Sequence, residues 1–464
     1  MRLDEEPGFG IVSAATLPEV RTIRSGSAPG TAVRCGLDDT MLSVLPVNVV
    51  FFFEKTMDSV RLIDGLAQAL DRVPVFGGTL RTRDGELEIV CEDVGVPVTI
   101  VDLDEDLATA VGRVSQPGAG FVDQVDVWNA RDSGLPLLSV RINQLVGGGT
   151  ALGCSFNHAV GDMNSFMVFM QVWSAAVEGT PPPDVRIPTD RDAYLDQALP
   201  REDSGTPGIW LPDPDQAEQR NQEFGVAFAP DANRTVHLYF TAAEVARVRA
   251  EFSAAAGRKL STNDAFCAHL LGTIRGLDDE DDGLTERLLT LVVNLRRRFD
   301  LPPFVIGNLI SQIHLLCPPR GAPELVAAQI RAAVDDFARS HLSFRANLAF
   351  LDTVGRARLA DCTPIGFDPA RRAFVYSDWR GFGVYDVAFG GQRPVYFCQT
   401  ADLQLPWGGW TSEGVGGTGC LSVVCLPTKL AERLTDTDGR AAMHRFREPS
   451  ETLPDLALAV PTLA

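Results

Sequence analysis

The pattern of apolar and polar positions predicts strands that alternate with helices in the first part of the chain. Residues 44–53 (VLPVNVVFFF) are almost continuously apolar and predict a buried strand, whereas residues 60–70 carry apolar side chains at helical spacing. Residues 78–90 predict a β-hairpin that turns at Asp84-Gly85. This part of the chain is therefore typical of α/β units.

A second predicted hairpin leads directly to a histidine. Its strands are residues 137–146 and 150–156, separated by a triple glycine, and the second strand ends just before His158. From Ser165 onward the apolar residues recur every three or four positions, which predicts a helix that ends by Gly179. The buried stripe of this helix consists of Phe166, Phe169, Met170, Trp173 and Val177.

The second half of the chain shows the same mixture of strands and helices. A proline-rich stretch, residues 179–217, separates the halves and predicts a linker. Beyond it, residues 242–255 predict a helix, and Ser261 with Asp264, an acidic relative of the capping box, opens another. No element is predicted for the tail after Arg440. The predicted strands are residues 235–240, 288–293, 309–316, 373–375 and 421–426.

The length of 464 residues exceeds what one compact hydrophobic core usually holds, so we expect two domains and two cores. The fold class that follows is α/β, with sheet and helices in each half. The expected boundaries are an N-terminal domain at residues 1–178, a crossover linker at 179–220, a C-terminal domain at 221–440 and a tail at 441–464.

Composition excludes several classes of partner. Hydrophobic residues make up 45% and charged residues 22%, as in soluble globular proteins, and a net charge of -20 argues against nucleic acid. The longest apolar run is about half of the ~18 residues that span a bilayer, so no membrane association is expected. The N-terminus (MRLDEEPGFG) does not resemble a secretory signal, and nine cysteines without CxxC spacing are typical of reduced thiols. We therefore expect a cytoplasmic protein without a bound metal.

His158 is the strongest candidate for chemistry. At the end of a buried strand, a neutral imidazole can accept a proton near pH 7 and return it later, as a general base does. The alternative is a histidine whose role is only structural. Asp162, four residues on, could orient the imidazole as in a serine-hydrolase triad, or pair with an arginine. The string Gly153-Cys154-Ser155-Phe156-Asn157 ends in asparagine where a nucleophile elbow requires glycine, which disfavours a hydrolase.

Six segments in order resemble the BAHD family of acyl-CoA-dependent acyltransferases of plants and fungi, with their microbial relatives. The first is VPVFGGTL (73–80), and the second is the glycine-rich hairpin with HxxxD and the following helix (137–179). Next come LSTNDAFCAHL (260–270) and NLRRRFDLPPFVIGN (294–308). The last two are SDWR (377–380), similar to the Ser/Thr-x-Trp element, and YDVAFGGQRP (385–394), similar to the DFGWG motif. The resemblance covers residues 37–436.

The resemblance implies two similarly folded domains, each a mixed β-sheet with helices, and an active-site channel between them. An acyl-CoA would enter from one side as co-substrate and a small-molecule alcohol or amine from the other, with no permanently bound cofactor. By similarity, His158 is the general base, Trp379 and Ser377 stabilise the oxyanion, and Asp162 pairs with Arg296. Trp379 could instead be a core aromatic, and Arg297 and Arg298 could lie on a solvated face.

The resemblance also implies residues on the cofactor side. Thr262 and Asn308 match positions near the CoA channel, with a helix cap and a turn as their respective alternatives. Phe389 and Gly390 belong to the stretch AFGGQ, which lacks the aspartate and tryptophan of DFGWG; Asp386 is a carboxylate two residues away from the motif's position. Met163 stands where plant members usually have glycine, which suggests a distant, microbial branch.

We therefore expect a monomeric acyltransferase that transfers an acyl group from a CoA thioester to a hydroxyl or amine of a small specialised metabolite. Two alternatives remain. A condensation-like enzyme would use a carrier-protein thioester, although such enzymes favour a second histidine where Asn157 stands here. A non-catalytic relative would bind a small molecule in the same channel.

Overall fold

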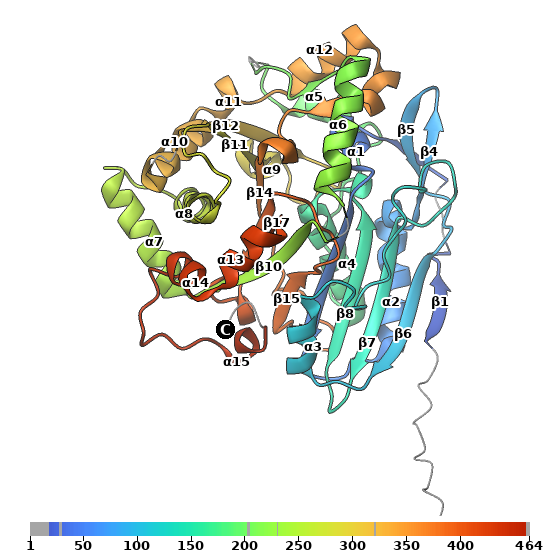
Figure 1. Ribbon diagram of the computed structural model, residues 1–464. Helices are drawn as coiled ribbons and strands as arrows, with labels where there is room; N and C mark the ends of the chain where they lie inside the picture. Colours follow the sequence, from blue (N-terminus) through green and yellow to red (C-terminus); the bar gives the residue numbers. More distant parts are fainter. Residues whose placement is uncertain (1–17, 27–29, 202–204, 230, 320–321, 461–464) are drawn as a thin grey trace, which may run out of the picture.

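Two six-stranded mixed sheets face each other in the computed structural model, which describes residues 18–26, 30–201, 205–229, 231–319 and 322–460 (Figure 1). The first sheet has the order β1 (Glu19–Ile23), β6 (Val96–Leu103), β7 (Leu138–Leu145), β8 (Thr150–Asn157), β3 (Pro46–Phe53) and β15 (Tyr396–Gln399). The second has the order β10 (Asn233–Phe240), β17 (Cys420–Pro427), β16 (Gly408–Glu413), β14 (Phe374–Asp378), β11 (Arg287–Asn294) and β12 (Ile310–Cys317).

Helices α2 (Ser59–Arg72) and α4 (Met163–Glu178) cover one face of the first sheet and build its core with the strands. Their approach is close, because a Cβ at Gly65 would lie 2.4 Å from the Val177 side chain. A side chain larger than hydrogen at Gly65 would push the two helices apart.

The second core lies between the second sheet and a group of helices that includes α8 (Thr262–Leu277). Ser261 caps α8: its hydroxyl accepts from the Asp264 amide, and the Asp264 carboxylate accepts from the Ser261 amide. The predicted capping box is confirmed. The other helices around this sheet are α7 (Ala242–Ala255), α9 (Leu295–Arg298), α10 (Pro323–Asp335), α11 (Phe337–Ser340), α13 (Thr428–Thr435) and α14 (Thr437–Met443).

A third apolar cluster joins the inner faces of the two sheets. It combines Val50 and Phe52 of the first sheet with Tyr239, Trp410 and Val423 of the second. Since these residues are buried in one cluster, the two sheets pack directly against each other.

The remaining elements are short and lie around the two sheets. Small sheets are formed by β2 (Ala32–Arg34), β5 (Glu86–Val90) and β4 (Thr79–Arg83), and by β9 (Ile209–Trp210) and β13 (Thr363–Pro364). The remaining α-helices are α1 (Leu37–Leu42), α3 (Leu107–Val114), α5 (Arg191–Ala198), α6 (Pro214–Ala227), α12 (Phe344–Val354) and α15 (Asp455–Leu458). The 3-10 turns are η1 (Pro74–Gly77), η2 (His158–Val160), η3 (Arg356–Asp361), η4 (Pro369–Arg371) and η5 (Val415–Gly417).

The strands predicted from long apolar runs are all present, and Asp84 and Gly85 turn the first hairpin with φ of 50° and 82°. The described part of the proline-rich stretch holds more secondary structure than expected, since it includes α5 and β9 and leads into α6. The tail is also ordered through residue 460: α15 lies beside α3, and Ala457 and Val460 are buried (Figure 1). Tertiary contacts, rather than local periodicity, hold these segments.

Part of the second half completes the first sheet. Strand β15 pairs antiparallel with β3, and Phe389 and Phe397 are buried in the first core. Residues 384–399 therefore lie with the N-terminal sheet although they fall in the range expected for the C-terminal domain. Within the described residues, every helix is too short or too polar to span a bilayer.

Candidate active site

His158 lies where β8 ends and the turn η2 begins. Its amide donates to the Leu45 carbonyl at 3.0 Å, so the backbone is held by the neighbouring chain. Asn157 holds the turn through its side chain, which accepts from the Ala159 amide and donates to the Ser43 carbonyl, both at 2.9 Å. The asparagine at this position therefore has a structural role.

The His158 side chain is half-buried, and within the described part of the chain its Nδ1 has no hydrogen-bond partner. Burial lowers the pKa of His158, while the nearby carboxylate of Asp162 and the Asn308 side chain act in the opposite direction. The net effect favours the neutral imidazole, which is the form that accepts a proton.

Both carboxylate oxygens of Asp162 accept hydrogen bonds from groups other than the imidazole. One carboxylate oxygen accepts from the Ser165 amide at 2.8 Å and caps α4. The other accepts from Arg296 at 2.6 Å and from the Leu309 amide at 3.1 Å. Because neither oxygen bonds to His158, the hydrolase-triad alternative is wrong.

Arg296 is itself buried and connects the two halves. Its guanidinium donates to Ser165 Oγ at 2.9 Å, to the Val305 carbonyl at 2.8 Å and to the Gly307 carbonyl at 3.0 Å. The ion pair therefore joins the start of α4 to the loop before β12. The next residue, Arg297, is exposed, as the solvated-face alternative expected.

Ser377 and Trp379 lie on and just after β14 and bond to each other. The indole N–H of Trp379 donates to Ser377 Oγ at 3.1 Å. The Trp379 ring stacks on Trp410, with centroids 6.2 Å apart and planes inclined by 16°, and contacts both the first core and the inter-sheet cluster. Trp379 is thus half-buried at the boundary of the two sheets.

Comparison with known proteins shows which family the chain belongs to. The model of the Transferase family matches residues 36–408. The chain belongs to this family. It is the BAHD-type family that the motifs indicated, and the chain is therefore an acyltransferase with the expected two-domain mixed α/β fold.

Relatives of this acyltransferase differ in what their names say they modify. Limonoid 21-O-acetyltransferase of Melia azedarach is 23% identical, with 78% of this chain and 81% of the relative covered. A hydroxycinnamoyl-CoA:5-hydroxyanthranilate N-hydroxycinnamoyltransferase of Avena sativa is 26% identical, with 74% and 77% covered. The structure of F. graminearum TRI101 with coenzyme A and deoxynivalenol has a TM-score of 0.68 at 15% identity, covering 88% of this chain and 98% of that one.

The sequence did not indicate the hydrogen-bond partners of Asn308. Its side-chain amide is buried and donates to Asp39 Oδ1 at 2.7 Å and to the His158 carbonyl at 2.8 Å. Neither Asp39 nor its ion-pair partner Arg191 was singled out from the sequence. Isolated polar residues 39, 191 and 308 carry no shared motif, so only the folded chain brings them together.

The four residues expected on the cofactor side belong to three segments: Thr262 opens α8, Asn308 precedes β12, and Phe389 and Gly390 line one cavity. Thr262 is the first residue of α8 and not its cap, which is Ser261. The Phe389 ring is buried against Phe53 and Trp173, with centroids 6.0 and 5.3 Å away. Gly390 borders a cavity of about 200 Å³.

The AFGGQ stretch is docked on the N-terminal half. Ser174 of α4 donates to the Ala388 carbonyl at 2.7 Å and accepts from its amide at 3.0 Å. Asp386 does not replace the missing motif aspartate: it lies outside any strand, is mostly exposed and pairs with Arg393 at 3.6 Å.

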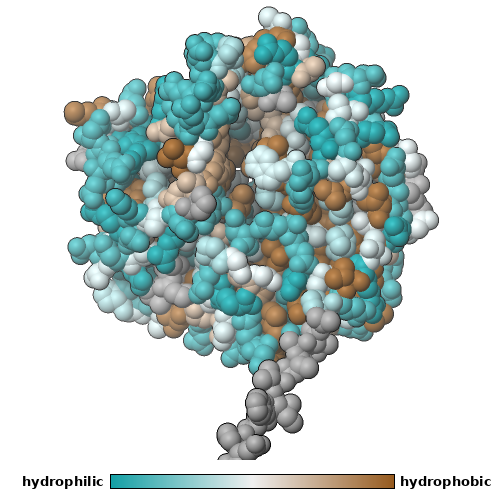
Figure 2. Space-filling model, turned by 45° about the vertical axis from the view of Figure 1, so that its right-hand side comes forward, coloured by the Kyte–Doolittle hydropathy of each residue, from teal (hydrophilic) through white to brown (hydrophobic). Residues whose placement is uncertain are grey.

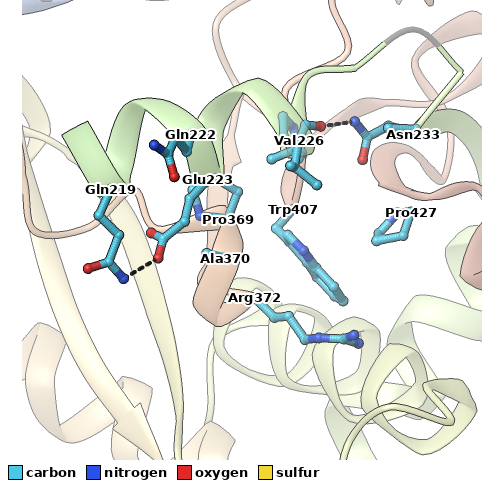
Figure 3. Close-up of a pocket in the computed structure, with 13 residues that line it drawn as sticks. Gln219, Gln222, Glu223, Val226, Asn233, Pro369, Ala370, Arg372, Trp407 and Pro427 are labelled. Atoms are coloured by element: carbon cyan, nitrogen blue, oxygen red, sulfur yellow. Dashed lines mark hydrogen bonds between the residues drawn. The ribbon is translucent and has the colours of Figure 1, made fainter. Parts of the chain in front are cut away.

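A cavity of about 510 Å³ is lined by residues other than these (Figure 3). It opens between α6 and the strand ends that follow Arg372 and Trp407, whereas Ser377 and Trp379 lie at the opposite end of β14. The surface view shows mixed hydrophilic and hydrophobic residues around a hollow in its upper half (Figure 2). No group of three or more metal-ligating side chains gathers in the part of the chain that the structure describes.

Proposed function

We propose that this protein transfers an acyl group from acyl-CoA to a hydroxyl or amine of a small specialised metabolite, with His158 as general base. The observation that carries the proposal is the half-buried imidazole of His158 at the end of β8, whose pKa burial lowers, in a chain of this family. A relative named for a hydroxycinnamoyl-CoA donor and a fold neighbour crystallised with coenzyme A support the choice of donor.

In the proposed reaction, the neutral imidazole removes the proton from the acceptor hydroxyl or amine as its oxygen or nitrogen attacks the thioester carbonyl. The C–S bond then breaks, and the imidazolium returns the proton to the leaving thiolate of CoA. No acyl-enzyme forms in this scheme. Asp162 supports the site through Arg296 and takes no proton.

Ser377 is the donor that we propose for the oxyanion of the tetrahedral intermediate. Because the Trp379 N–H already donates to Ser377 Oγ, the hydroxyl proton of Ser377 is free to point to another acceptor. A donor aimed at developing charge in a site with little water can lower the barrier by several kcal/mol. Trp379 would then act through Ser377.

Residues on the cofactor side remain part of the proposal rather than of the observed geometry. We propose that Thr262 lies beside the path of acyl-CoA, and that Phe389 and Gly390 act through the docked AFGGQ stretch instead of by direct contact with the adenine or phosphates. Location in the cytoplasm, action as a monomer, the microbial branch and the domain boundaries stay predictions.

The test is a donor screen by mass spectrometry with purified protein. Acetyl-, malonyl-, hydroxycinnamoyl- and longer acyl-CoA esters are offered with mixtures of alcohols and amines, and both acylated product and free CoA thiol are measured. We expect product and thiol in equal amounts. Product with acyl-carrier protein alone would support the condensation-like alternative, and tight binding of acceptors without turnover would support a binding protein.

A further inference from the structure

The three carbonyl groups of the η2 turn, which begins with His158, each receive a hydrogen bond from outside the turn. Asn308 donates to the His158 carbonyl at 2.8 Å. The two Nη atoms of Arg191 donate to the Ala159 and Val160 carbonyls, each at 2.7 Å. Two side chains, Asn308 and Arg191, thus bind all three carbonyls of the turn that carries the imidazole.

Asp39 links these two side chains. Its Oδ1 lies 2.8 Å from Arg191 Nη1 and accepts from Asn308 Nδ2 at 2.7 Å, while its Oδ2 accepts from the Gly36 amide at 2.7 Å. We call Asp39, Arg191 and Asn308 the turn clamp. All three side chains are at most 4% exposed.

The turn clamp collects residues from three distant segments. Asp39 lies on α1, Arg191 opens α5 in the crossover between the halves, and Asn308 lies in the loop before β12. The conformation of the His158 turn therefore depends on the crossover and on the second half being docked.

A buried ion pair is a poor means of stabilising a fold, because desolvation offsets most of the attraction. Well-packed apolar residues would hold the same segments together at least as well. What apolar residues cannot do is bind three successive carbonyls in one fixed geometry. The arrangement is thus suited to setting a backbone orientation.

We propose that Asp39, Arg191 and Asn308 are positioning residues that fix the orientation of the His158 imidazole for proton transfer. This inference rests on the proposed role of His158 as general base. Asp39 and Arg191 act through the backbone of η2, whereas Asn308 binds the His158 carbonyl and its side chain also raises the pKa of the imidazole. Small displacements of a catalytic group can cost about a hundredfold in rate, so the clamp should affect turnover more than binding.

The test compares Arg191→Lys, Asn308→Ala and Asp39→Asn with Arg356→Met. Arg356 pairs with Asp192 on the same crossover helix at 3.0 Å but does not bond to the turn, so it controls for loosening of the crossover. We expect Arg191→Lys and Asn308→Ala to lower kcat about 10- to 100-fold, with the KM for acyl-CoA changed less than threefold and circular dichroism unchanged. Arg356→Met should keep wild-type kcat.

A second readout does not require turnover. The charge of Asp39 raises the pKa of His158, so Asp39→Asn should lower that pKa in an NMR titration of the free protein and move the acid limb of kcat/KM the same way. This readout tests whether the charge of Asp39 reaches the imidazole, and the split between kcat and KM tests positioning.

Three results are distinguishable. If His158→Ala abolishes turnover while all clamp variants fold and keep wild-type kcat, the positioning role is wrong and the proposed function stands. If kcat falls only in proportion to the loss of folded protein, the clamp is structural and the inference is also overturned. If His158→Ala retains full activity, the proposed mechanism and the inference built on it fail together.

Discussion

Ser377 and Trp379 are tied by one hydrogen bond, and this bond separates their proposed roles. Replacing Ser377 with Ala removes the proposed oxyanion donor, and we expect kcat to fall about 100-fold with little change in KM. Trp379→Phe keeps most of the stacking on Trp410 but loses the N–H, so its kcat should fall less, about 10-fold. If Trp379 were only a core aromatic, Trp379→Phe would lower the melting temperature and leave kcat unchanged.

The Asp162–Arg296 pair makes a second prediction at the scale of single residues. Asp162→Asn leaves the buried guanidinium without a counter-charge and should lower the free energy of unfolding by about 3–5 kcal/mol in urea denaturation. Asp386→Asn is the matched control, because its ion pair with Arg393 is mostly exposed and should contribute less than about 1 kcal/mol. Equal effects of the two variants would contradict this account.

At the scale of single residues, the sequence could indicate His158, Asp162 and Arg296 because each belongs to a contiguous motif. It could not indicate Asp39 or Arg191. A carboxylate in a short helix and an arginine in a proline-rich stretch look like solvated residues, and only the fold shows that they are 3% exposed or less. Asn308 was singled out for the cofactor side, which stays a prediction, but its side-chain bonds to the His158 carbonyl and to Asp39 were not foreseen.

Among the elements predicted correctly, β3 and α4 have long signals. The eight residues of β3 and the 16 of α4 give enough apolar positions to define a period. Strand β15 has only four residues and pairs with β3, nearly 350 positions earlier, so no local pattern predicts it. The same holds for α15, which depends on its contact with α3.

The docking of AFGGQ on α4 gives a prediction for these elements. Ser174 makes both a donated and an accepted bond to Ala388, so Ser174→Ala leaves two partly buried backbone groups without this partner. We expect a loss of about 1–3 kcal/mol and faster amide exchange over residues 386–392. Ser133→Ala, whose hydroxyl makes two bonds within its own loop, should leave exchange over residues 386–392 unchanged. Unchanged exchange in Ser174→Ala would show that the other contacts of the stretch hold it, among them the buried Phe389 ring and the bond from the Gly391 amide to Glu178.

For the whole molecule, buried histidines link stability to pH. Burial lowers the pKa of His237 and of His269 to about 4, while the unfolded chain binds the same protons near pH 6.5. Below pH 6.5 the unfolded state therefore binds protons that the folded state does not bind. The free energy of unfolding falls until about pH 4, by about 3 kcal/mol per histidine.

Replacing His237 with Leu tests this linkage. The slope of the unfolding free energy between pH 6 and 4.5 should become shallower by about 1.4 kcal/mol per pH unit, measured by urea denaturation. Half-buried His341 is the control, and His341→Gln should change the slope less. An unchanged slope in His237→Leu would show that His237 is protonated in the folded protein.

The central claim is that one neutral imidazole performs the proton transfer, and the most direct measurement is turnover of His158→Ala with the preferred acyl-CoA and acceptor. We predict a fall in kcat of at least about 100-fold, with acyl-CoA binding by calorimetry retained and, in the wild type, an acid limb of kcat/KM centred below pH 6.5. Wild-type turnover by His158→Ala would contradict the account.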